Sequence, residues 1–248
     1  MKSSKSSALF TPRWQVAANV GALQSTRCGG ASESPYDSFN LGNHVGDEPK
    51  KVGVNRATLN NFLPASAHFV QQVHGTHIHT VREGECTEHI QADGLFTNTS
   101  HRPLAIMTAD CLPVLLASDD GTEIAALHCG WRSLAGGIIE RAVPLFNAKP
   151  QSISAWLGPA IGPLAFEVGA EVNAQFIALD KRHGDAFTAT GDKFLADLPL
   201  IATQKLHSLG VVSVSHQQEC TYSQGDKYFS YRRDGQTGRM ATVIWRKY

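Results

Sequence analysis

The chain has 248 residues, of which 42% are hydrophobic, so it can bury a sizeable globular core. Lysine plus arginine equals aspartate plus glutamate at 22 each, which leaves no net field to attract nucleic acid, an acidic membrane surface or a polyanion. We therefore expect a small neutral or locally anionic ligand, with no nucleic-acid or membrane partner.

The N-terminus and the cysteines indicate the compartment. The first ten residues, MKSSKSSALF, hold no apolar stretch long enough for a signal peptide, and no later stretch reaches transmembrane length. The five cysteines lack the spacing of a secreted disulfide scaffold and include no Cys-x-x-Cys pair. We expect a cytoplasmic protein with free thiols, in which residues 1–10 are flexible.

The first half of the chain predicts a long loop, a helix and several strands. Residues 25–48 are rich in Gly, Ser, Asn and Asp, which predicts a long loop of the kind that is often functional. A proline start and apolar residues at helical spacing predict a helix over residues 49–63. Alternating and buried apolar patterns predict strands over residues 68–75, 76–83, 103–108 and 113–117.

The second half predicts further helices and strands. Apolar residues at helical spacing predict helices over residues 134–146, 171–179 and 198–209, the first of them in spite of two glycines and Pro144. β-type runs predict strands over residues 210–215, 228–232 and 240–245. Because no repeat, charge block or low-complexity linker divides the chain, we expect one mixed α/β domain over residues 1–248, as a monomer.

A predicted hairpin brings a cysteine and a histidine together. The turn signal SDDG, residues 118–121, separates two apolar runs. If all four residues form the loop, Cys111 stands directly opposite His128; if Asp120 and Gly121 alone make the turn, the two are diagonal neighbours. Both registers put the two side chains on one face of the sheet, since only an odd slip or a bulge would separate them.

A thiolate beside an imidazole suits two chemistries. The pair can act as nucleophile and base, or as two ligands of a soft or borderline metal, although either residue alone is more often part of a core. His74 in QQVHG, followed by the flexible Gly75, offers a third ligand. A Cys/His/His set leaves a fourth position open, as catalytic zinc sites do. We expect His77 and His79 to face solvent or to lie beside a ligand.

Several motifs in the same order together resemble the YfiH family, which is described as polyphenol oxidase or laccase-like and also as purine nucleoside phosphorylase. They are FNLGNHVGDE followed by NR, QQVHG, ADGLFT, TADCLPVLL, HCGWR, WLGPAIGP, FEVG and FSYRRDGQTGRMA. The similarity runs from about Gly29 to Trp245. Where the family commonly has HAGWRG, this chain has Cys129 and Ser133; Cys129 would point to the face opposite His128 and is expected to be a packing residue.

The resemblance implies an activity as well as a fold. It implies a zinc site made by His74, Cys111 and His128, and phosphate-dependent cleavage of adenosine, inosine and methylthioadenosine, with adenosine deamination as a second activity. The implied fold is a layered α/β structure related to cysteine-histidine toxin deamidases. The expected partners are therefore purine nucleosides and phosphate, and the expected cofactor is zinc, with copper as the alternative metal.

Further residues are candidates for binding and catalysis by their motif positions. Arg132, four residues beyond His128, and Arg56 in the predicted helix could bind phosphate with a bidentate guanidinium, although Arg56 could equally lie on a solvated helix face. Asn43 and His44 in the loop could reach a nucleoside, although turn chemistry is the simpler interpretation.

Two aspartates have more than one interpretation. Asp93 could act as an acid or base, or orient a ligand histidine through its second nitrogen, although an Asp-Gly pair is more often a turn. The same ambiguity applies to Asp110. By composition alone, Arg232 and Arg233 are surface charges.

Other functions compete with the phosphorylase. A copper-dependent polyphenol oxidase would use Cys111, two histidines and the nearby Met107. A metal-free Cys-His amide hydrolase, editing peptidoglycan precursors, would need only Cys111 and His128. A non-catalytic binding module is also possible, because a fold does not prove turnover. No dinucleotide fingerprint or phosphate loop is present, so NAD and ATP chemistry are not expected.

Overall fold

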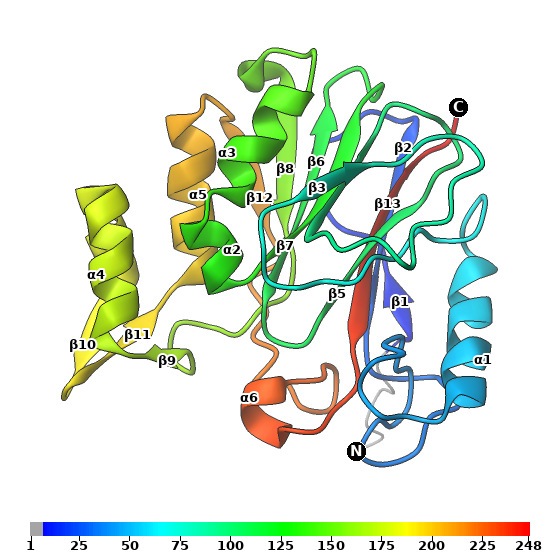
Figure 1. Cartoon of the computed structure of the whole chain (residues 1–248), viewed down its shortest axis with the longest axis horizontal. Coiled ribbons are helices and arrows are strands. Elements are labelled where there is room, and N and C mark those ends of the chain that lie inside the picture. Colours follow the sequence, from blue (N-terminus) through cyan, green and yellow to red (C-terminus); the bar gives the residue numbers. More distant parts are fainter. Residues whose placement is uncertain (1–6) are drawn as a thin grey trace.

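A six-stranded mixed sheet lies at the centre of the fold in the computed structural model, which describes residues 7–248 (Figure 1). Its strand order is β12-β8-β6-β7-β4-β3. Its strands are β3 (Ile78–Thr80), β4 (Gly94–Thr97), β6 (Leu112–Ser118), β7 (Ile124–Cys129), β8 (Ile153–Leu157) and β12 (Ser213–His216). β6 and β7 are fully buried, as expected of strands covered on both faces.

A four-stranded sheet packs against one face of this central sheet. Its order is β1-β2-β13-β5, with antiparallel pairing throughout. Its strands are β1 (Leu9–Phe10), β2 (Val20–Ser25), β5 (Leu104–Thr108) and β13 (Met240–Arg246). Alternate residues of the two sheets meet in one apolar cluster, which includes Ile106, Leu115 and Ala126, because successive side chains of a strand point to opposite faces.

Helices cover the other face of the central sheet. They are α2 (Trp131–Ala135), α3 (Ile138–Ala142), α4 (Ala170–Leu179) and α5 (Leu198–Ser208). Their apolar side chains pack with Val114, Leu127 and Cys129 in the largest core cluster. Cys129 is thus a buried packing residue on the face opposite His128, as predicted.

Helix α1 (Pro49–Asn60) lies on the outer face of the four-stranded sheet (Figure 1). Its Leu59 packs with Phe39 and Leu41 of the preceding loop, and with Met107 of β5. The chain is therefore layered as helices, central sheet, second sheet, and helix with loop. The predicted mixed α/β fold class is confirmed, and residues 26–48 form the predicted long loop.

A small unit extends from the helical side of the molecule (Figure 1). It consists of a three-stranded sheet in the order β10-β11-β9, together with α4 and a 3₁₀ helix, Lys181–Ala186. Its strands are β9 (Glu167–Val168), β10 (Phe187–Thr190) and β11 (Lys193–Ala196). The unit begins immediately after Phe166, so its base borders the cavity described below.

The predicted helix over residues 134–146 is wrong in its extent. The segment forms α2 and α3 as separate short helices, followed by a 3₁₀ turn over Val143–Leu145. Gly137 has a φ of 86°, a left-handed conformation that interrupts a right-handed helix. Pro144 lacks the N–H that would continue the helix past its end.

Two predicted strands are also wrong. Residues 68–75 form only isolated bridges at His68 and Gln71, so this segment is not a continuous strand. Residues 228–232 do not form a strand, because Ser230 caps the short helix α6 (Tyr231–Asp234) by accepting the N–H of Arg233 at 3.2 Å.

The N-terminal segment is only partly as predicted. Of the segment 1–10 that was expected to be flexible, residues 1–6 lie outside the described part, whereas Leu9–Phe10 pairs with β2 as β1. No helix among residues 7–248 is long and apolar enough to cross a membrane.

Candidate functional site

The β6–β7 hairpin sets the position of Cys111 relative to His128. Pro113 pairs with His128 and Leu112 with Cys129, so Cys111 is the diagonal neighbour of His128 rather than its direct partner. The register in which all four residues 118–121 form the loop is wrong, because it would pair Ala117 with Thr122, whereas Ala117 pairs with Ile124. Both registers nevertheless predicted correctly that Cys111 and His128 lie on the same face of the central sheet. This face is the one that packs against the four-stranded sheet.

His74 approaches this pair from the segment before β3. Its Nε2 lies 3.9 Å from Sγ of Cys111, and its ring centroid lies 4.8 Å from that of His128. One ligand atom from each of the three residues lies within 4.8 Å of the others. The three residues that the hairpin geometry and the resemblance singled out are therefore close together in space.

Asp93 is the buried group that holds the side chain of His128 and the backbone of His74. Its Oδ1 lies 2.8 Å from Nδ1 of His128 and accepts the backbone N–H of His74 at 2.9 Å, while Oδ2 accepts the N–H of Gly75 at 2.6 Å. Burial alone would raise the pKa of Asp93, but the hydrogen bonds from His128 and the backbone amides hold it below its usual value.

The contacts of Asp93 determine how both histidines are presented. Because Nδ1 of His128 is engaged by the carboxylate, Nε2 is the nitrogen left for a ligand. The backbone of His74 has a φ of 58°, which a non-glycine residue rarely adopts. The carboxylate stabilises this conformation through the successive amides of Val73, His74 and Gly75.

Opposite charges stabilise the reactive form of the cysteine. Burial alone would raise the pKa of Cys111, but the charge and hydrogen bond of His128 lower it to about 6. Burial would lower the pKa of His128, whereas the Cys111 thiolate and Asp93 raise it to about 9. His128 therefore favours the thiolate form of Cys111, which is the form in which cysteine attacks or binds metal.

Asp110 and Gly130 shape the backbone around Cys111. Asp110 has a φ of 102°, and its carboxylate accepts the Thr221 hydroxyl and the N–H of Arg232, each at 2.6 Å. A Cβ at Gly130 would lie 3.0 Å from Sγ of Cys111 and 3.3 Å from Cδ2 of His74. Glycine at this position therefore leaves the space that the three ligand atoms need.

The donor set fits a zinc ion. One thiolate and two imidazoles are ligands that zinc prefers, and three protein ligands are typical of its catalytic sites. Copper binds the same donor types, so the geometry by itself leaves the metal open. Within residues 7–248, no other group of three or more His, Cys, Asp and Glu side chains converges in this way.

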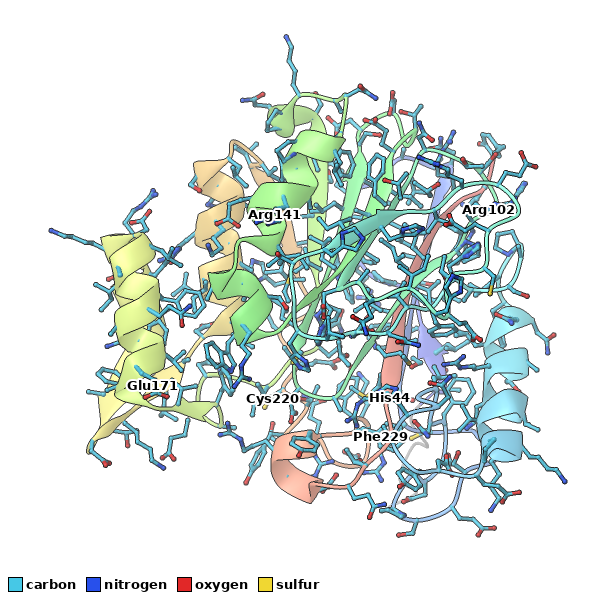
Figure 2. The ribbon with its side chains drawn as sticks, in the orientation of Figure 1. His44, Arg102, Arg141, Glu171, Cys220 and Phe229 are labelled. Atoms are coloured by element: carbon cyan, nitrogen blue, oxygen red, sulfur yellow. The ribbon has the colours of Figure 1, made fainter. Side chains whose placement is uncertain are left out.

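A cavity of about 500 Å³ extends from this cluster. Trp131, Ile161, Phe166 and Leu198 give it apolar walls, and His44, Arg132, Arg232 and Arg239 give it cationic and polar ones. An apolar pocket with a few polar groups at one end is typical of a small-molecule site. In Figure 2, His44 lies near the lower end of β13, the strand that Arg239 immediately precedes.

The structure places the two predicted phosphate ligands differently. Arg132 is exposed in the first turn of α2, and its guanidinium stacks 4.4 Å from the ring of Trp131 at the cavity wall. Arg56 lies outside this cavity: it donates to the Leu41 carbonyl at 2.9 Å, pairs with Glu88 at 2.6 Å and covers Phe69. Nε and Nη1 of Arg56 thus have protein partners.

The two loop residues lie on either side of the cavity border. His44 is exposed and lines both the 500 Å³ cavity and a neighbouring cavity of about 340 Å³. Asn43 lines only the smaller one, together with Arg56. Partial desolvation at the cavity border, together with the charges of Arg239 and Arg56, lowers the pKa of His44, so its imidazole is neutral at neutral pH.

Arg239 was not named as a candidate from the sequence, although it stands in the motif FSYRRDGQTGRMA. It is half-buried and lines the cavity, and burial lowers its pKa below the usual value. Of the two arginines expected to be surface charges, Arg232 lines the cavity and Arg233 donates to the carbonyls of Thr221, Tyr222 and Tyr228. Local sequence patterns could not identify Arg239, because the residues that position it, Asn40 and Gly42, are about 200 positions away in the sequence.

The sequence matches one protein family over nearly its whole length. The family model described as "Multi-copper polyphenol oxidoreductase laccase" matches residues 21–247. A Shigella flexneri protein named purine nucleoside phosphorylase YfiH is 48% identical over 241 residues, covering 96% of this chain and 99% of the relative. An Escherichia coli K12 protein of the same name is 47% identical over the same coverage.

Solved structures have the same fold. Neisseria meningitidis protein NMB0706 matches with a TM-score of 0.91 and 40% identity, covering 98% of this chain and all of the other. The Bacillus licheniformis hypothetical protein YfiH matches with a TM-score of 0.87 and 30% identity, covering 92% and 93% of the two chains.

Proposed function

The chain belongs to the YfiH family, and we propose that it is a zinc-dependent purine nucleoside phosphorylase. The names of the curated relatives support the reaction, and the Cys/His/His donor set supports the metal. His74, Cys111 and His128 would hold the zinc ion.

One observation carries the proposal: a Cys/His/His cluster and several cationic side chains line the same cavity of about 500 Å³. A nucleoside needs apolar walls for its base, and the co-substrate phosphate needs positive charge. The aromatic rings of Trp131 and Phe166 supply the first requirement and the arginines the second. A phosphorylase must hold both substrates in one cavity.

The chemistry can be divided among the residues. A bound zinc ion would polarise a ligand oxygen and lower the pKa of a coordinated water. Asp93 keeps His128 in the tautomer that presents Nε2, and the arginines, with Arg132 at the wall, stabilise the phosphate. A phosphate oxygen forms a bond to C1′ of the ribose as the C1′–N9 bond breaks, and the purine leaves with the electron pair and takes up a proton.

The proposed substrates are adenosine, inosine and methylthioadenosine. Adenosine deamination, in which water replaces the amino group at C6 and ammonia leaves, is the proposed second activity of the same cavity. We propose a cytoplasmic location, with which the five free cysteines agree. We also propose that the protein is a single-domain monomer.

Product analysis tests the proposal. The purified protein is incubated with adenosine or inosine, with and without phosphate, and the products are separated by chromatography. We expect phosphate-dependent release of free base, lost in Cys111→Ala and retained in Cys86→Ala, which removes an exposed cysteine away from the cavity. If no base and no deaminated product form, the phosphorylase proposal is wrong.

The description of the family model favours a second candidate, a copper-dependent polyphenol oxidase. Multicopper oxidases need several copper sites, whereas residues 7–248 bring together one candidate donor set. Oxygen consumption by the copper-loaded protein with a polyphenol tests this candidate. Turnover that exceeds nucleoside cleavage by the zinc-loaded protein would favour the oxidase.

A further inference from the structure

Three arginines line the cavity without a carboxylate partner. The arginine ion pairs within residues 7–248 involve Arg27, Arg56, Arg102, Arg182 and Arg233. The cavity arginines 132, 232 and 239 are not among them. Asp110 lines the same cavity, but its oxygens accept the Thr221 hydroxyl and the N–H of Arg232. The three guanidinium groups thus outnumber the two negative groups that line the same cavity, the Asp110 carboxylate and the Cys111 thiolate, in a chain whose net charge is zero.

Arg239 is the most constrained of the three. Its Nη1 donates to the carbonyl oxygens of Thr237 and Gly238, each at 2.9 Å. Its backbone N–H donates to Oδ1 of Asn40 at 2.8 Å, and its carbonyl accepts the N–H of Leu41 at 3.1 Å. The guanidinium is therefore held in place before a ligand arrives, which lowers the entropy cost of binding.

Gly42 makes room for the stem of this arginine. A Cβ at Gly42 would lie 2.8 Å from Cγ and 3.2 Å from Cβ of Arg239. These atoms are close to the backbone, so the side chain could not move aside without displacing its guanidinium. The long loop 26–48 and the start of β13 are thus fitted to each other at Arg239.

The remaining donors of Arg239 have no protein partner. Nε and Nη2 donate to no atom of the described residues, whereas every other nitrogen of this residue is engaged. By contrast, Arg132 is exposed against Trp131, and Arg232 donates to the Glu167 carbonyl at 3.0 Å. A half-buried guanidinium with free donors is a site for a tetrahedral oxyanion, because the fork of N–H groups matches two phosphate oxygens.

We propose that Arg239, positioned by Gly42 and the long loop, is the primary ligand of inorganic phosphate, and that Arg132 at the cavity wall is secondary. This assignment rests on the proposed function for its biological meaning, but it concerns anion binding and can be measured without nucleoside turnover. A phosphate monoester such as AMP presents the same oxygens, so the experiment distinguishes the two sources.

The test is phosphate binding to the zinc-loaded protein by calorimetry, together with KM values for phosphate and adenosine. We expect Arg239→Gln to weaken phosphate binding and to raise the phosphate KM by about 10- to 100-fold, the usual effect of losing a charged hydrogen bond. The adenosine KM and the zinc content should stay close to the wild-type values. Arg132→Gln should change the phosphate KM by less than about threefold.

Two further variants keep the test decisive if Arg239→Gln does not fold. Arg239→Lys keeps the charge but loses the fork, and it should recover part of the affinity. Gly42→Ala should raise the phosphate KM more than the adenosine KM. Its matched control is Gly53→Ala, in α1, where an added Cβ meets nothing within 4 Å.

The outcomes separate this inference from the proposed function. Phosphate binding that depends on Arg239 without release of purine base would support the inference and contradict the phosphorylase. Base release with an unchanged phosphate KM in Arg239→Gln would do the reverse. Arg239-dependent binding of AMP but not of phosphate would overturn the assignment to inorganic phosphate, and a wild-type protein that neither binds phosphate nor releases base would overturn both.

Discussion

The two ends of the cavity differ in how far the hydrogen-bonding groups of their charged side chains are satisfied by the protein. At the Cys/His end, the buried carboxylate of Asp93 accepts donors from His128 and from three successive backbone amides. At the arginine end, Arg239 is held by carbonyls and keeps Nε and Nη2 free. Groups that must keep a fixed geometry are saturated by the protein, whereas a group that must receive a charged ligand keeps open donors.

The largest expected effect comes from removing a side chain at the Cys/His end. His74→Ala should lose zinc and reduce nucleoside cleavage about 100-fold or more, because a three-ligand site becomes a two-ligand site. Zinc content by mass spectrometry and product release by chromatography measure this, with the exposed His77→Ala as control. Nearly normal turnover in His74→Ala would instead support a metal-free Cys111–His128 hydrolase.

The next largest effect should come from replacing Asp93, the carboxylate that holds His128 and the backbone of His74. Asp93→Asn replaces a carboxylate that accepts four donors by an amide with one acceptor oxygen. Zinc affinity should fall about 10- to 100-fold, and the free energy of unfolding should fall by about 1–3 kcal/mol. Urea unfolding and zinc titration measure the two changes, and Asp192→Asn on the exposed β10–β11 turn is the control. Equal zinc affinity in both variants would show that Asp93 does not orient the ligands.

A smaller effect is expected from crowding the same end. Gly130→Ala brings a methyl group to 3.0 Å from Sγ of Cys111, and overpacking of this kind costs about 1–3 kcal/mol. We expect weaker cobalt binding, measured by the thiolate absorption of the cobalt-substituted protein. Gly53→Ala should bind cobalt as the wild type does, and the prediction fails if Gly130→Ala does so too.

Arg56 sharpens the comparison because it pairs with a carboxylate, that of Glu88, and its Nε is engaged by the Leu41 carbonyl, whereas Arg239 has no ion pair and keeps Nε free. Arg56→Met should lower the free energy of unfolding by about 1–2 kcal/mol, through loss of the Leu41 hydrogen bond and the cation–π contact with Phe69. The phosphate KM should not change. A phosphate KM raised as far as in Arg239→Gln would restore Arg56 as a phosphate ligand.

The smallest effect concerns a saturated carboxylate that is partly exposed. Burial would raise the pKa of Glu219, but Lys227, Tyr228 and Gln217 hold it below the usual value. Its stabilisation is therefore present above the pKa of the unfolded chain and is lost as the pH falls through the lower, folded value. Solvent screening limits it to less than about 1 kcal/mol. Glu219→Gln should be less stable than the wild type at neutral pH, and the difference should shrink as the pH falls below the pKa of the unfolded chain, as urea unfolding over a series of pH values would measure.

The helices and strands with strong apolar patterns could be predicted from the sequence. β5, β6, β13, α4 and α5 lie within a few residues of their predicted bounds. The errors fall where a local pattern competes with a specific contact. The Ser230 hydroxyl begins α6 where the apolar Tyr228 and Phe229 indicated a strand, and Gln72 pairs its amide with the backbone of Met107 where an ordinary strand was expected.

The sequence alone determined that Cys111 and His128 share a face, because side chains alternate along a strand and every even register preserves that parity. It could not choose between the two registers, which differ only in how the turn closes. The tertiary structure decided which charges are satisfied. Asp93 reaches His128 across 35 positions and Asn40 reaches Arg239 across 199; such partners depend on packing between layers, for which a local pattern carries no signal.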